Sequence, residues 1–289
     1  MATAETGTRA RPVLRPLTLL FSAASVLVLI AAWQLFVLTD QTDRFFAWTI
    51  GVPLTAAVDG AFYLAAFLLL FPATRARAWV EVKPLTFGVL CISTLKLAAT
   101  LLHLSLFHFT QGPATARFAA WGWLAVYVLV PIALIVLILA ELRSEGADPP
   151  ATQPMSRGLR WVTGLLAAGL VVIGAGMLLA PSTMAAHWPW PLTPLTSQAL
   201  SAWFVGIGVL AILVVQDDDV VRARNLWTAA LMLPLLQAIA LIRYGDAVAW
   251  GSFAAWAYVA VFALIGVIGV WGTASSRTAA AATRRPARS

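Results

Sequence analysis

Eight long apolar stretches constrain the fold of this 289-residue chain more than any other feature. Each has about 19 to 23 residues, which at about 1.5 Å per residue is enough to cross roughly 30 Å of hydrocarbon. They cover Leu17–Leu38, Pro53–Phe71, Leu85–Phe107, Phe118–Ala140, Leu159–Ala180, Leu195–Val215, Leu226–Tyr244 and Phe253–Gly272. With 61% hydrophobic and 11% charged residues, the chain has too little polar surface to cover a soluble globule. The sequence therefore predicts an all-α, polytopic membrane helix bundle with eight transmembrane helices.

The basic residues are distributed unequally between the two sides of such a bundle. Of 19 Lys and Arg residues, 15 fall in the two tails and in alternate connections, whereas only Arg44, Arg117 and Arg243 fall in the others. Because basic segments are retained in the cytoplasm, we expect a multi-pass protein of the plasma (inner) membrane with cytoplasmic N- and C-termini. We also expect these cations to meet anionic lipid and not nucleic acid.

Two pairs of motifs indicate an internal repeat. Phe-Ala-Ala-Trp begins at Phe118 and again at Phe253, and a Trp followed by Pro-Leu-Thr occurs at Trp48 and at Trp190. The second pair has an offset of 141 residues, measured from Pro53 to Pro194. The sequence thus predicts two tandem four-helix repeats, residues 1–144 and 158–289, joined by a cytoplasmic linker, 145–157. The first repeat includes a short basic N-terminal tail, and the second ends in a basic tail, 274–289.

The orientation of the repeats follows from their helix number. An even number of spans in each repeat gives both the same orientation in the membrane, and binding sites in such proteins lie near the interface of the repeats.

The paired tracts Phe45-Phe-Ala-Trp48 and His187-Trp-Pro-Trp190 carry a resemblance. With them the chain resembles a group of uncharacterised multi-pass integral membrane proteins of high-GC, actinobacterial-type bacteria. The resemblance covers most of the chain. It implies the eight-span architecture and no known activity.

Two charged residues, Asp59 and Lys96, fall well inside predicted spans, where a charge is costly and usually functional. Ser93, Lys96, Thr100 and His103 follow helical spacing and form one polar stripe. Because helical side chains lean toward the N-terminus of their helix, Lys96 should point away from Asp59. We therefore expect Asp59 to pair with His103, and Lys96 to be neutral, linked to water or bound to a ligand anion.

The offset of 141 extends this site to the second half, since it relates Lys96 to Gln237 and His103 to Tyr244, but Asp59 to Leu200. The candidates for ligand binding or a proton path are Asp59, Lys96, Thr100, His103, Gln237 and Tyr244. A buried polar network that only fixes helix register would show the same residues, and it is weighed ahead of a ligand or proton path.

Aromatic residues cluster at the predicted outer ends of the spans. An interfacial belt accounts for most of them. Four residues are also candidates for the rim of an outward-facing entrance that contacts lipid or an apolar ligand: Trp48, His187, Trp188 and Trp190.

Metal and catalytic motifs are weak in this sequence. His103 and His108 are five residues apart, which places them on different helix faces, and we expect no metal site and no catalytic residues. Asp217, Asp218 and Asp219 are expected to form a solvated charge cluster, not a magnesium site. A haem held by one histidine and a ligand from a neighbouring helix remains an alternative, as the only cofactor under consideration.

The favoured function is a membrane protein that binds or transports a small solute, ion or lipid at an outward-facing site between the repeats. Its expected partners are membrane lipids and a small-molecule ligand. One alternative is a non-catalytic subunit or scaffold of a larger membrane complex, or a homodimer. A second alternative is a haem-binding or lipid-modifying membrane enzyme.

Overall fold

The structure, a computed structural model, describes residues 10–283, and within this range eight helices are long and apolar enough to cross a membrane. The same range contains helices and their connections but no β-strand. The prediction of an all-helical integral membrane protein is therefore confirmed. Four arginines of the predicted cytoplasmic tails lie outside the described residues: Arg9, Arg284, Arg285 and Arg288.

The spans are joined by short connections that contain small helices. The eight spans are α1 (Arg15–Ala32, continued by a π-helical turn, Trp33–Val37), α3 (Pro53–Ala73), α4 (Trp79–Leu102), α5 (Ala114–Arg143), α6 (Arg157–Leu179), α8 (Pro194–Asp217), α9 (Arg224–Arg243) and α10 (Phe253–Thr283). The connections contain α2 (Thr42–Phe45), α7 (Pro181–Ala186) and three 3-10 turns, Thr39–Gln41, Leu104–Leu106 and Gly245–Ala247.

Helix α4 differs from its predicted bounds at both ends, beginning at Trp79 and ending at Leu102. Pro84 lies inside it, in the second helical turn. A proline this close to a helix start removes few backbone hydrogen bonds, so the helix can continue through it. Pro53 and Pro194 do stand at the first positions of α3 and α8.

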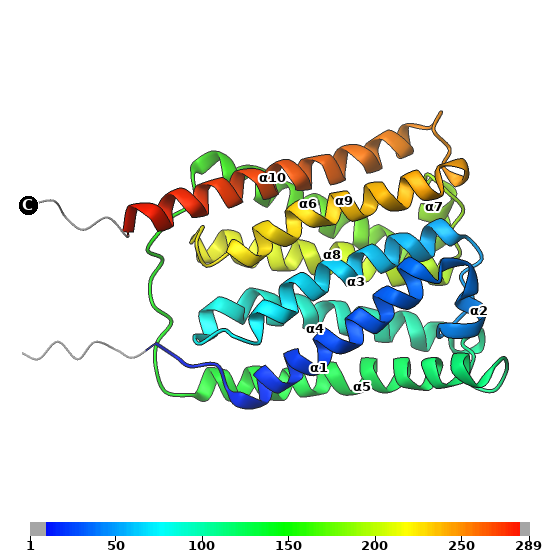
Figure 1. Ribbon diagram of the computed structural model, residues 1–289, viewed down its shortest axis with the longest axis horizontal. Coiled ribbons are helices and arrows are strands. Elements are labelled where there is room, and N and C mark those ends of the chain that lie inside the picture. The colour runs from blue at the N-terminus through cyan, green and yellow to red at the C-terminus, as the bar shows by residue number, and fades with distance from the viewer. Residues whose placement is uncertain (1–9, 284–289) are drawn as a thin grey trace, which may run out of the picture.

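Helices α3 and α8 occupy the centre of the bundle (Figure 1). In their most apolar windows 67% of the residues are buried, against at most 33% in the other spans. Helix α3 packs on α1 and α9, and α8 packs on α6 and α4, while α5 and α10 cover α4 and α9 from outside. Helices α1, α5, α6 and α10 thus form the outer layer.

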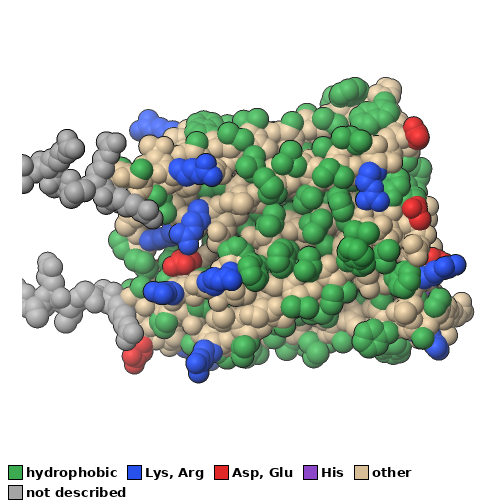
Figure 2. All heavy atoms as spheres, viewed as in Figure 1, with side chains coloured by type: hydrophobic (Ala, Val, Ile, Leu, Met, Phe, Trp, Pro, Cys, Tyr) green, Lys and Arg blue, Asp and Glu red, His purple; other side chains and the backbone are tan. Residues whose placement is uncertain are grey.

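Large apolar side chains cover the outer surface between the two ends of the bundle, and Figure 2 shows the charged side chains lying toward those ends. Phe118, Leu179, Ile242 and Phe253 are each more than 80% exposed. An apolar surface of this extent is suited to lipid. We call the end at which α1 begins and α10 ends the proximal end, and the opposite end the distal end (Figure 1).

Some glycines allow helices to approach closely. A Cβ added at Gly174 would lie 2.9 Å from the backbone nitrogen of Val205, and one at Gly269 would lie 2.6 Å from that of Leu231. An atom added at Gly169 has nothing within 4 Å. Gly174 and Gly269 therefore lie at close helix contacts, and Gly169 does not.

The linker between the halves is fastened to the proximal end of α8 through Asp219. This carboxylate accepts hydrogen bonds from the backbone N–H groups of Thr152, Val221 and Arg222 at 2.9–3.0 Å. Burial by itself raises the pKa of Asp219, but these donors and the Arg222 charge outweigh it, and the pKa lies below its ordinary value. The expectation of a solvated cluster is wrong here, because Asp219 is buried and bonded to the linker.

Candidate functional site

A buried ion pair joins α3 to α4 near the centre of the bundle. The Nζ atom of Lys96 lies 3.1 Å from Oδ1 and 3.4 Å from Oδ2 of Asp59. Lys96 is 0% exposed and Asp59 is 2% exposed. Two charges this deep persist only where each has a partner, because an unpaired charge in hydrocarbon is costly.

The expected pairing of Asp59 with His103 is wrong. Helix α4 ends at Leu102, so Lys96 lies six residues from its distal end, and Asp59 lies six residues from the distal start of α3 at Pro53. At about 1.5 Å per residue, both side chains are therefore at the same depth of about 9 Å. His103 lies just beyond the helix, where its Nε2–H donates to Oε1 of Gln198 on α8 at 2.7 Å.

Three aromatic rings surround the ammonium group of Lys96. Its Nζ lies 5.1 Å from the ring centroid of Trp203, 5.2 Å from that of Tyr63 and 5.4 Å from that of Trp123. The Nε1–H of Trp203 also donates to Oδ1 of Asp59 at 2.6 Å. Ring faces attract cations, so this aromatic cage replaces part of the hydration shell of Lys96.

Thr100 belongs to the same buried network, Gln237 is buried beside it on α9, and Tyr244 lies apart from both. Thr100 donates to the backbone oxygen of Lys96 at 2.8 Å and accepts from Nε1 of Trp123 at 2.9 Å. Gln237 on α9 donates to the backbone oxygen of Val58, next to Asp59 on α3. The structure thus gathers Asp59, Lys96, Thr100 and Gln237 but separates them from His103 and Tyr244, the latter hydrogen-bonded to Thr39.

The aromatic residues at the distal end form a plug over the ion pair, not the rim of an entrance. Trp48 packs edge-on against Trp123, which in turn covers Lys96. Trp48 and Trp190 are each 2% exposed, whereas His187 is exposed and bonds to the backbone of its own segment. The polar residues are therefore covered at the distal end, and the described residues show no opening there.

The plug has the same geometry in both halves. The ring centroids of Trp48 and Trp123 lie 4.9 Å apart at 83°, and those of Trp190 and Tyr258 lie 5.0 Å apart at 81°. Phe46 and Trp188 occupy corresponding places beside these pairs, with edge-on contacts at 5.3 and 5.8 Å.

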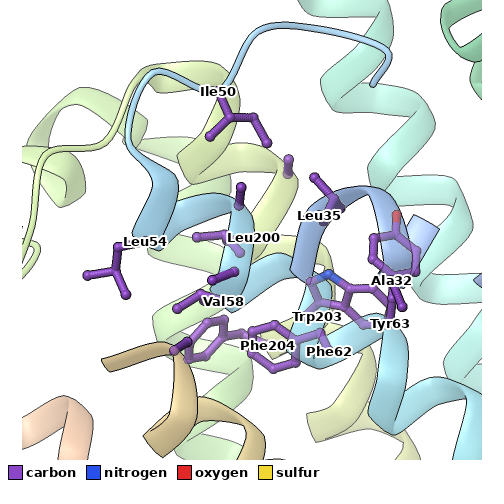
Figure 3. Packing of buried hydrophobic residues seen from close by; sticks show 14 of the residues in the cluster. Ala32, Leu35, Ile50, Leu54, Val58, Phe62, Tyr63, Leu200, Trp203 and Phe204 are labelled. Carbon is purple, nitrogen blue, oxygen red and sulfur yellow. The ribbon is translucent and has the colours of Figure 1, made fainter. Parts of the chain in front are cut away.

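A cavity of about 170 Å³ lies on the proximal side of the ion pair, between the central helices, and we call it the central cavity. Its distal wall contains Tyr63 and Tyr127, whose hydroxyl groups are 2.6 Å apart, and the stacked rings of Phe62 and Trp203. Figure 3 shows Phe62 and Trp203 side by side, from α3 and α8. The same Trp203 ring therefore contacts the cavity, the carboxylate and the ammonium group.

Four leucines separate the central cavity from a second hollow of about 370 Å³ at the proximal end, the vestibule. The leucines line both spaces, and we call them the leucine collar: Leu69, Leu85, Leu210 and Leu226. The vestibule is lined by charged residues that include Arg75, Arg222 and Arg224. The spaces along the centre of the bundle therefore lead from the ion pair toward the proximal end.

Comparisons of the chain with protein-family models, curated proteins and solved structures give no match. The function is therefore argued from geometry.

Sequence reasoning missed the aromatic cage. The belt interpretation does not single out Tyr63, Trp123 or Trp203, although all three lie several residues inside their helices. Trp203 follows Phe62 by the repeat offset of 141 residues, and this correspondence could have singled it out.

Proposed function

We propose that the protein is a membrane carrier that binds a small ligand in the central cavity and opens alternately toward the two ends of the bundle. The observation that carries this proposal is the Asp59–Lys96 ion pair, buried between the central cavity and the distal plug. Replacing a buried ion pair with apolar residues is often neutral or stabilising, so stability alone is a weak reason to keep one. A charged pair whose partners separate during a transport cycle is a stronger reason.

We also propose that two tandem repeats in parallel orientation form this carrier, residues 1–144 and 158–289. The collar supports this, because Leu69 and Leu210 are related by the offset of 141 residues, as are Leu85 and Leu226. The helix packing supports it as well, since α3 packs on α9 and, in the corresponding places, α8 packs on α4. Ligand sites at the interface of parallel repeats are common in carriers.

Cysteine accessibility tests alternate opening without knowledge of the ligand. In a Cys91→Ala background, Thr55→Cys places a thiol at the distal end of α3, where Thr55 is buried and accepts a hydrogen bond from Trp190. We expect a membrane-impermeant maleimide applied at the distal side to react with it slowly. Ala167→Cys, equally buried but packed between α6 and α8, is the matched control and should not react.

Changing the ion pair should change this reactivity. Lys96→Met and Trp203→Phe each remove a partner of Asp59, the second while keeping an aromatic ring. We expect either variant to alter the reaction rate at position 55 severalfold. A carrier is excluded if Thr55→Cys is as inert as Ala167→Cys, or if it reacts at one rate in all three backgrounds, as a static scaffold would.

A further inference from the structure

The central cavity and the vestibule differ in chemistry, and together they indicate a class of ligand. We propose that the ligand is a single-chain amphiphile whose apolar tail occupies the central cavity and whose negatively charged head lies in the vestibule. This inference rests on the proposed carrier function and names its substrate class.

The central cavity is suited to a hydrocarbon chain because its lining offers almost no free polar atom. The hydroxyl groups of Tyr63 and Tyr127 are bonded to each other, and that of Ser93 donates to the backbone oxygen of Leu90. Most of the remaining lining is aliphatic. An apolar cavity of this size holds a molecule such as benzene, or roughly six to eight carbons of a chain.

The cavity also reaches the lipid-facing surface. Ala23 and Leu27 line it, and both are exposed on the outer face of α1, Leu27 by 42%. Since α1 belongs to the outer layer, hydrocarbon and not water surrounds this opening. An apolar tail could enter here from the bilayer, whereas an ion or a hydrophilic solute would have to shed its hydration shell.

The vestibule supplies positive charge where the head of such a ligand would lie. Arg222 is compensated by Asp217 and Asp219. Arg75 and Arg224 form no ion pair within the described part of the chain, and Glu81 is the remaining carboxylate of the vestibule. Two arginines against one carboxylate favour a head with negative charge, such as a carboxylate or a phosphate.

The two spaces adjoin, because the four residues of the leucine collar line both. One ligand can occupy the cavity and the vestibule at once when its chain passes between the side chains of the collar. Apolar burial of the tail and charge at the head then act together on the same molecule.

Photolabelling of the protein in lipid nanodiscs tests the proposal directly. The probe is a medium-chain fatty acid with a diazirine at the chain terminus, and the matched probe has the same chain and diazirine but a trimethylammonium head. We expect the fatty acid to label the cavity-lining parts of α3 and α8 saturably. The ammonium probe should label them at least about tenfold less at equal concentration. A tenfold difference in affinity is about what one ionic contact contributes.

Variants separate the contributions of tail and head. Ala66→Phe fills the cavity and should abolish labelling there, whereas Ala125→Phe, on the exposed face of α5, should leave it unchanged. Arg75→Gln combined with Arg224→Gln should weaken labelling by the fatty acid about tenfold and should not weaken labelling by the ammonium probe, because the repulsion of its head is removed.

The proposal is overturned if both probes label the cavity equally, or if labelling occurs only on lipid-facing surfaces and survives Ala66→Phe. Retention of the gel-filtration profile by each variant shows that lost labelling does not reflect unfolding. The maleimide experiment uses no amphiphile, so alternate opening without fatty-acid labelling would retain the carrier and reject only this ligand class.

Discussion

The Lys96 ammonium group is shielded from solvent, and its charge is stabilised by one carboxylate and three aromatic rings. The ammonium group is 0% exposed, and Asp59 is the carboxylate paired with it. Removing one member of a buried pair leaves the other charge uncompensated, which usually costs more than the pair itself contributes. Each single substitution should therefore be more harmful than the joint replacement of both residues.

We expect Lys96→Met to destabilise the protein by about 3–5 kcal/mol, because it leaves Asp59 buried without its cation. The double variant Lys96→Met with Asp59→Leu should recover most of the loss. Thermal unfolding midpoints in one detergent measure both effects. A double variant that is less stable than either single variant would contradict this interpretation.

For single residues, the sequence indicated which polar side chains lie inside the membrane but not which of them contact each other. Asp59, Lys96 and Thr100 lie together in one buried network, and Gln237 is buried beside it; that these residues bind a ligand stays a prediction. The predicted pairing of Asp59 with His103 was wrong because the expected end of the third span was five residues too late. That shift displaced His103 into the membrane and moved Lys96 away from the depth of Asp59.

Helix α6 carries two glycines whose surroundings differ sharply. Gly174 faces the backbone of α8 at Val205, whereas Gly169 faces open space. Glycine spacing alone could not separate them, because contact depends on where the neighbouring helix crosses. The existence of helix α6 is therefore predictable from the length of its apolar stretch, whereas the face that it packs against α8 depends on tertiary packing.

Substitution by alanine should have opposite effects at these two positions. Gly174→Ala should destabilise the protein by about 1–3 kcal/mol, since the new methyl group overlaps α8. Gly169→Ala should stabilise it by about 0.5–1 kcal/mol through helix propensity. Thermal unfolding of both variants beside the parent measures the contrast, and equal shifts in one direction would refute the assigned helix crossing.

On the scale of the whole molecule, the number of spans follows from sequence because lipid imposes a minimum apolar length. All eight predicted spans correspond to helices of the structure. The repeat, the domain boundaries and the cytoplasmic position of the termini remain predictions, as does the plasma membrane as their location. The position of the central cavity and the vestibule on the proximal side of the ion pair was not predictable, because it depends on how the side chains pack along the centre of the bundle.

The charge distribution predicts that the proximal end faces the cytoplasm. A reporter enzyme active only in the cytoplasm, fused after residue 289, should therefore be active, and the same fusion within Gly245–Ala247 should be inactive. A reporter active outside the cytoplasm should give the reverse pattern. If a C-terminal tag is reachable from the exterior of intact cells, the assignment of sides is inverted.

The leucine collar is made of two residues from each half, at corresponding positions of α3 and α8 and of α4 and α9. If the halves are related by an axis through the bundle, a small rotation of one against the other displaces all four side chains together. The gap between the four leucine side chains would then change in a single step, without four separate rotamer changes. Its width would be a property of how the halves are docked, so substitutions far from the collar, at the contact of α3 with α9, could alter it.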